Sequence, residues 1–94
     1  MTQIQMAQYF SDRMNEVSAK CGIKIEQHFP GATGTYHGGE WLYSVESNMA
    51  TIWREGIEQK EEIRATKGSY LNLRAPSDFN AELKAAIGRL RELS

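Results

Sequence analysis

Apolar residues recur every three to four positions along the first part of the chain, a spacing that predicts an amphipathic helix. The stripe consists of Met6, Phe10, Met14, Val17 and Cys21. Thr2 followed by Gln5 has the spacing of a capping box, in which side chain and backbone at a helix start exchange hydrogen bonds. Gly22 stands where a left-handed C-cap is favoured. We predict a helix from about Gln3 to Cys21.

The apolar period shortens to two at Ile23, as in a half-buried strand. This alternation predicts a first strand over residues 23–29. The next ten residues, 30–39, hold four glycines and one proline and predict a loop. Within that loop Tyr36 and His37 are expected to contact a partner, because large side chains on a glycine-rich loop have little of their own chain to cover.

A second strand is predicted at about residues 40–46, where three apolar side chains alternate: Trp41, Tyr43 and Val45. Residues 49–67 fit either a helical stripe or strands. Gly56 interrupts the stripe, and residues 51–53 are all β-branched or aromatic. Together with the alternation over residues 70–74, this favours strands in a meander, with a helix over 49–67 as the alternative.

The last element predicted is a helix that begins after Pro76, with Ser77 or Asp78 at its start. Its apolar stripe is Phe79, Leu83, Ala86, Ile87, Leu90 and Leu93. Gly88 interrupts it at a cost of about 1 kcal/mol relative to alanine. Two such helices bury their stripes economically on one face of a meander. The sequence therefore predicts a single α+β domain over residues 1–94: an N-terminal helix, an antiparallel meander of three to five strands and a C-terminal helix, with both helices packed on one sheet face.

Composition excludes several classes of small protein. The 94 residues carry eleven basic and twelve acidic side chains, a net charge of -1 that argues against uniform coating of nucleic acid. The single cysteine, Cys21, leaves no internal disulfide and no cysteine-rich zinc site, and its place in the apolar stripe predicts a core residue. No metal or other cofactor is predicted. Polar residues interrupt the apolar stretches and the start lacks a secretory pattern, so we expect a cytoplasmic protein without membrane contact.

No arrangement of side chains in the sequence predicts catalysis. His28 and His37 lie nine positions apart, and neither has a ligand-type residue at helical spacing. The glycines within 31–39 lack the lysine and the following helix of a phosphate-binding loop. The carboxylates within 58–62 alternate with bases, which is typical of a solvated face. We predict a non-enzymatic protein; an enzyme would need His37 or Glu40 in a closed pocket.

The candidate partner-binding residues combine strand aromatics with arginines of the last helix. Residues 40–62 hold six acids and two bases, whereas residues 63–94 hold six bases and three acids. On the second strand Leu42 points to the sheet face opposite to that of Trp41 and Tyr43. The sheet is therefore either covered on both faces or exposes an aromatic patch. An exposed aromatic patch that basic residues do not surround is more typical of a protein interface than of a nucleic-acid site. The predicted partner-binding set is Tyr36, His37, Trp41, Tyr43, Trp53, Arg89 and Arg91.

The expected function is protein binding, as a small regulator or inhibitor of a larger macromolecular machine. Size and class are compatible with a bacterial or phage inhibitor of a host defence nuclease complex. The alternative is an RNA- or DNA-binding module that uses the bases of the C-terminal third: Arg64, Lys67, Arg74, Lys84, Arg89 and Arg91. The element order resembles that of double-stranded-RNA-binding domains, but the last helix starts at Ser77–Asn80 without that family's lysine cluster, so no binding residues carry over. A homodimer through the stripe of the last helix stays open.

Overall fold

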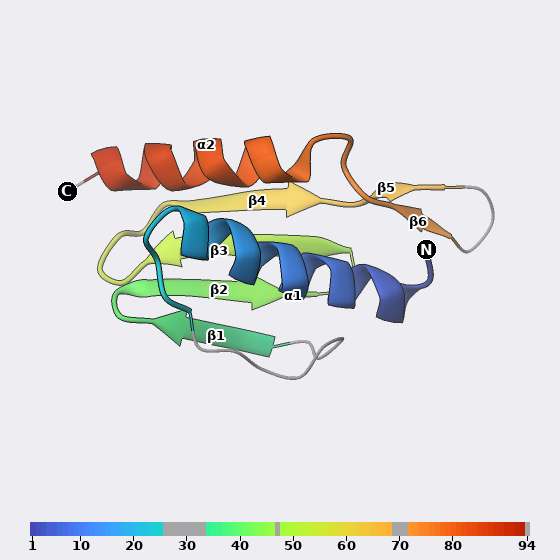
Figure 1. Ribbon diagram of the computed structural model, residues 1–94, viewed down its shortest axis with the longest axis horizontal. Coiled ribbons are helices and arrows are strands. Elements are labelled where there is room, and N and C mark those ends of the chain that lie inside the picture. The colour runs from blue at the N-terminus through green and yellow to red at the C-terminus, as the bar shows by residue number, and fades with distance from the viewer. Residues whose placement is uncertain (26–33, 47, 69–71, 94) are drawn as a thin grey trace.

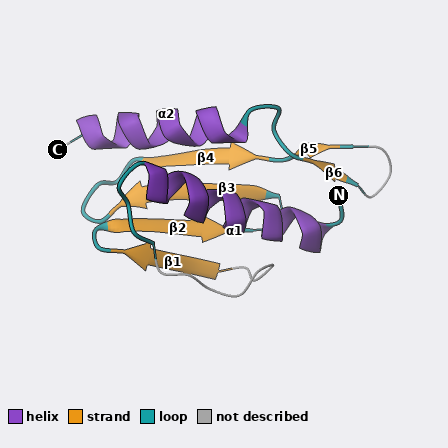
Figure 2. Ribbon diagram, viewed as in Figure 1, coloured by secondary structure: helices purple, strands orange, loops and turns teal. Residues whose placement is uncertain are grey.

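The computed structural model describes residues 1–25, 34–46, 48–68 and 72–93. Within these residues the helices α1 (Gln3–Lys20) and α2 (Phe79–Glu92) pack on one face of a four-stranded antiparallel sheet (Figure 1; Figure 2). The strands lie side by side in chain order: β1 (Gly34–Gly38), β2 (Trp41–Val45), β3 (Met49–Arg54) and β4 (Lys60–Arg64). A short antiparallel pair, β5 (Thr66–Lys67) and β6 (Leu73–Arg74), precedes α2. This arrangement confirms the predicted α+β fold.

Both helices begin at the capping residues that the sequence indicated. Thr2 Oγ1 accepts the backbone N–H of Gln5 at 3.2 Å, and Gln5 Oε1 accepts the backbone N–H of Thr2 at 2.9 Å. Asp78 caps α2 by accepting the N–H of Ala81 at 3.3 Å. Gly88 lies on the exposed side of α2, where an added Cβ would have no neighbour within 4 Å. The packing of α2 therefore does not require that glycine.

The hydrophobic core lies between the inner face of the sheet and the two helices. The strands contribute Trp41, Tyr43, Val45, Ala50, Ile52 and Ile63, and all six are buried. The helices contribute Met6, Phe10, Met14, Val17, Phe79, Leu83, Ala86, Ile87 and Leu90. The ring centroids of Phe10 and Phe79 lie 5.3 Å apart where α1 meets α2. Because both predicted stripes face this core, the other face of the sheet receives no helix from the described chain.

The loop predicted over 30–39 is wrong in its second half, because residues 34–38 form β1. Its glycines suggested a loop since glycine weakens strands. Here Gly38 is the point at which the chain after α1 crosses β1 at close range. That crossing segment, residues 23–25, forms no strand, which corrects the start of the strand predicted over 23–29. The rest of that prediction, residues 26–29, lies outside the described residues.

The ambiguous segment 49–67 forms strands, so the helical alternative is wrong. β3 and β4 are antiparallel, with Ala50 opposite Ile63 on the inner face. Gly56, in the turn after β3, has a φ of 83°, a left-handed conformation that glycine adopts at little cost. Of the strand predicted over 70–74, Leu73 and Arg74 form β6, and the start lies outside the described residues.

A buried polar contact joins β2 to α1. The hydroxyl of Tyr43 donates to Asn15 Oδ1 at 3.2 Å, and Asn15 Nδ2 donates to the backbone oxygen of Ser11 at 3.0 Å. The Tyr43 side chain is fully buried. Burial raises the pKa of this phenol well above its ordinary value of 10.0, and nearby Tyr36 acts in the same direction. The folded protein therefore keeps the Tyr43 proton at a pH where an unfolded chain releases it.

We expect the protein to lose stability as the pH rises above about 10, the pKa of tyrosine in an unfolded chain. The stabilisation linked to the raised pKa is complete below that pH and falls as the pH rises toward the folded-state pKa. Tyr43→Phe should remove much of this alkaline loss, and at pH 7 it should lower the unfolding free energy by about 1 kcal/mol because the Asn15 hydrogen bond is gone. Urea unfolding of wild type and Tyr43→Phe between neutral and alkaline pH measures the difference in their unfolding free energies. A stability difference that does not change with pH would contradict the assignment.

Candidate functional site

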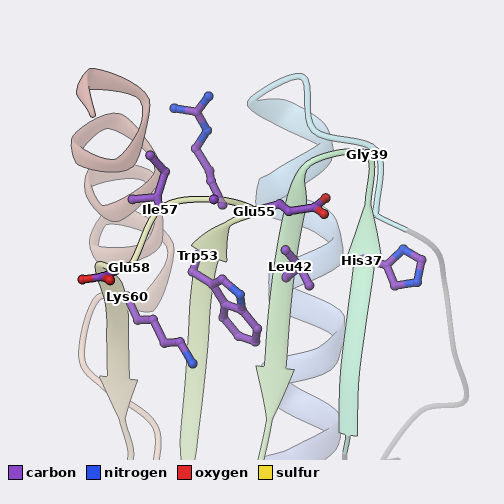
Figure 3. Close-up of a pocket in the computed structure, with 10 residues that line it drawn as sticks. His37, Gly39, Leu42, Trp53, Glu55, Ile57, Glu58 and Lys60 are labelled. Carbon is purple, nitrogen blue, oxygen red and sulfur yellow. The ribbon is translucent and has the colours of Figure 1, made fainter. Parts of the chain in front are cut away.

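The sheet face turned away from the helices carries two half-buried apolar side chains, Leu42 and Trp53. Strand alternation and pairing register place one residue of each strand on this face in a continuous row. The row runs His37, Leu42, Trp53 and Lys60. The next row is Thr35, Ser44, Thr51 and Glu62. Figure 3 shows the first row in front of the strands with both helices behind them. We call this surface the open face.

A shallow pocket of about 620 Å³ is hollowed into the open face near the β1–β2 and β3–β4 turns (Figure 3). Its floor is formed by the half-buried side chains of Leu42 and Trp53. Lys60 extends over the Trp53 ring, with its Nζ 4.5 Å from the ring centroid. Glu55 and Glu58 line the pocket as well. The site thus combines an apolar, aromatic floor with a charged border.

Of the predicted aromatic and histidine site residues, the open face brings together only His37 and Trp53. Tyr36, Trp41 and Tyr43 belong to the inner side of the sheet by register. Trp41 is 7% exposed and Tyr43 is fully buried. The Tyr36 ring lies 5.3 Å from the Tyr43 ring and packs against the core. These three residues therefore belong to the hydrophobic core or pack against it, and they do not form part of the open face.

The two predicted arginines of α2 lie on the helix side of the sheet and bind other parts of the chain. Arg89 Nη2 donates to Glu61 Oε1 at 2.7 Å, and this contact raises the pKa of the guanidinium. Arg91 Nη2 donates to the backbone oxygen of Cys21. The Arg91 guanidinium also lies 5.8 Å from the centre of the Trp41 ring. Both arginines thus tie α2 to neighbouring elements.

Three of the six bases of the C-terminal third make contacts within the chain. Arg64 pairs with Glu62 at 3.0 Å, and Arg89 and Arg91 make the contacts just given. The other three are exposed: Lys67 and Arg74 lie on the paired strands β5 and β6, and Lys84 lies on α2.

The pocket includes residues that the sequence analysis did not select. Leu42 was visible in the strand alternation as the residue opposite Trp41, and it now forms part of the floor. Lys60 could be placed beside Trp53 only from the register between β3 and β4. Among the residues that the structure describes, no three His, Cys, Asp or Glu side chains are placed to hold a metal ion.

Comparison of the chain with protein-family models, with curated proteins and with solved structures found no match. No helix of the described ranges is long and apolar enough to cross a lipid bilayer. The class of protein is thus defined by its fold and surface: a small α+β domain whose sheet has one helix-covered face and one open face.

Proposed function

We propose that this protein acts by binding another protein through the pocket of its open face. The observation that carries the proposal is Trp53, a large aromatic side chain on a sheet face that no described helix covers. Leu42 lies beside it in the neighbouring strand and shares the pocket floor. Tryptophan is enriched among the few residues that carry most of the energy of a protein interface, and such residues are typically framed by polar ones.

The charges around the pocket favour a protein over a nucleic acid as the partner. Glu55 and Glu58 both line it, and neither makes an ion pair with another described residue. Unpaired carboxylates repel phosphate groups, whose attraction to bases supplies most of the affinity for nucleic acids. Arg54 also lines the pocket, but its guanidinium is bound to Glu40 and to α2. Lys60 is therefore the described base most available to a ligand there.

In this proposal the chain is a non-enzymatic, cytoplasmic regulator or inhibitor of a larger assembly. Such a role needs only a surface that excludes or positions a partner, and it needs no reactive side chain. The open face supplies that surface, and the helix-covered face supplies the rigid support behind it. The charged border of the pocket would set the orientation of the partner, while the apolar floor would supply affinity.

The test is affinity capture from a lysate of the cells that produce the protein, followed by titration of the isolated partner. Wild type is compared with Trp53→Ala and with Ile4→Ala, which truncates a 74% exposed apolar side chain on α1, away from the open face. We expect a stoichiometric protein that Ile4→Ala retains. Trp53→Ala should weaken its binding at least tenfold, because truncation of a central tryptophan costs about 2 kcal/mol.

Circular dichroism and thermal unfolding of both variants control for folding. Capture that Trp53→Ala leaves unchanged would contradict the proposed surface. Retention that disappears on nuclease treatment would favour the nucleic-acid alternative instead.

A further inference from the structure

We propose that the open-face pocket takes a basic side chain of the partner protein, an arginine next to an apolar residue, in place of the chain's own Lys60. The inference rests on the proposed function and adds the chemistry of the segment that enters the pocket. The ammonium of Lys60 lies over the ring of Trp53, with Nζ 4.5 Å from the ring centroid (Figure 3). The pocket floor therefore already holds a cation, and this cation comes from the chain itself.

The contact between Lys60 and Trp53 is one that another cation can displace. Lys60 is exposed, and its ammonium makes no ion pair with a carboxylate of the described residues. A cation–π contact at an exposed site is weak, and a lysine side chain that leaves the ring regains rotamer freedom. A partner cation that makes a second contact in the pocket therefore binds the ring in preference to Lys60.

Glu55 supplies that second contact. Its carboxylate lines the pocket and makes no ion pair with another described residue. Figure 3 shows Glu55 directed across the turn end of the pocket, toward the side of Leu42. A guanidinium stacks on an aromatic ring and presents a planar set of N–H donors to a carboxylate, whereas an ammonium is a compact point charge. Arginine is therefore the basic side chain that uses both groups, and Leu42 takes its apolar neighbour.

The charges that line the pocket favour this basic occupant over an acidic one. Arg54 lines the pocket, but its guanidinium is already bound to the carboxylate of Glu40. The lining charges that stay unpaired are then two carboxylates, Glu55 and Glu58, against the single ammonium of Lys60. Like charges brought together across an interface are costly, so an acidic segment is disfavoured. The complementary segment carries positive charge.

The test titrates the full chain with a synthetic peptide, Ser-Leu-Arg-Leu-Ser with blocked ends, and follows the amide and indole N–H shifts by NMR. A peptide with citrulline in place of arginine is the control, because citrulline keeps the length and shape of the side chain without its charge. We expect the shifts to centre on Leu42, Trp53 and Glu55. The citrulline peptide should bind about fivefold more weakly, because it loses the contacts that depend on charge.

Lys60→Thr distinguishes displacement of Lys60 from attraction to it. Threonine keeps the strand preference of the position and removes the competing ammonium, so the arginine peptide should bind about threefold more tightly. Lys67→Thr is the matched control. It makes the same charge change at an exposed position of β5, at the end of the molecule far from the pocket, and should leave the affinity unchanged (Figure 1).

A second pair of variants tests the carboxylate contact. Glu55→Gln should weaken binding of the arginine peptide about threefold. Glu58→Gln makes the same charge change in the same turn, but Figure 3 shows Glu58 directed away from Trp53, so its effect should be smaller. The NMR spectra also show whether each variant is folded.

Weaker or unchanged binding of the arginine peptide to Lys60→Thr would overturn the proposal, as would equal binding of the citrulline peptide. Shifts of the same residues when the protein alone is concentrated would assign the pocket to a second copy, and would overturn it too. The proposed function can stand without this inference. A captured partner that requires Trp53, but binds Lys60→Thr more weakly than wild type, would keep the protein-binding surface and reject its preference for arginine.

Discussion

Gly38→Ala is expected to lower the free energy of unfolding by about 3 to 5 kcal/mol, enough to unfold much of a marginally stable domain. Gly38 lies on the inner side of β1, where the chain leaving α1 crosses the strand. An added Cβ would overlap the carbonyl oxygen of Lys24 and lie 2.7 Å from the Cα of Ile25. Both are backbone atoms, so no change of side-chain rotamer relieves the overlap. The crossing segment would have to move, and it carries buried Ile23 out of the core with it.

Gly39→Ala is the matched control for this prediction. Gly39 has a φ of 61°, and an added Cβ there would meet nothing within 4 Å. The cost is therefore limited to the backbone conformation, about 1 kcal/mol. Urea denaturation followed by circular dichroism compares the two variants with wild type. Equal losses for Gly38→Ala and Gly39→Ala would show that the crossing segment is not tightly held against β1.

The close approach at Gly38 also shows why the sequence alone missed β1. Helices α1 and α2 were predictable because their stripes and their capping residues, Thr2 and Asp78, depend on residues a few positions apart. β1 is a strand because it pairs with β2 and is crossed by a segment that precedes it in the chain. Glycine counts over 30–39 describe local conformational freedom, and they contain no information about that crossing.

The candidate site was predictable only in part, for the same reason. Trp41 and Trp53 both occur in predicted strands, yet the register puts one in the core and the other on the open face. Deciding between them requires the pairing of β2 with β3, which is a tertiary property. Likewise, the sequence indicates only that Arg89 is a cation on a helix. The structure shows that Glu61, 28 positions away, accepts its hydrogen bonds.

Arg54 is a further residue whose role depends on distant contacts. Its Nη1 donates to the backbone oxygens of Leu90 and Leu93, at 3.1 and 2.8 Å, and so satisfies carbonyls at the end of α2. Its Nη2 donates to both carboxylate oxygens of Glu40 at 3.2 Å, and its guanidinium lies 5.6 Å from the Trp41 ring centre. The side chain is only 19% exposed. One guanidinium thus joins β2, β3 and the C-terminus of α2.

We expect Arg54→Met to lower the free energy of unfolding by about 2 to 4 kcal/mol, because it leaves the end of α2 and the Glu40 carboxylate without their donor. Arg54→Lys should recover only part of the loss, since an ammonium cannot reproduce the planar set of donors. Arg64→Met is the control: it breaks an ion pair whose arginine is 65% exposed and should cost less than about 1 kcal/mol.

Urea unfolding gives the three values, and amide hydrogen exchange locates the change. In Arg54→Met the amides of the last turn of α2 should lose protection first, because that turn depends on a residue of β3. A loss equal to that of Arg64→Met, with the end of α2 still protected, would contradict this role.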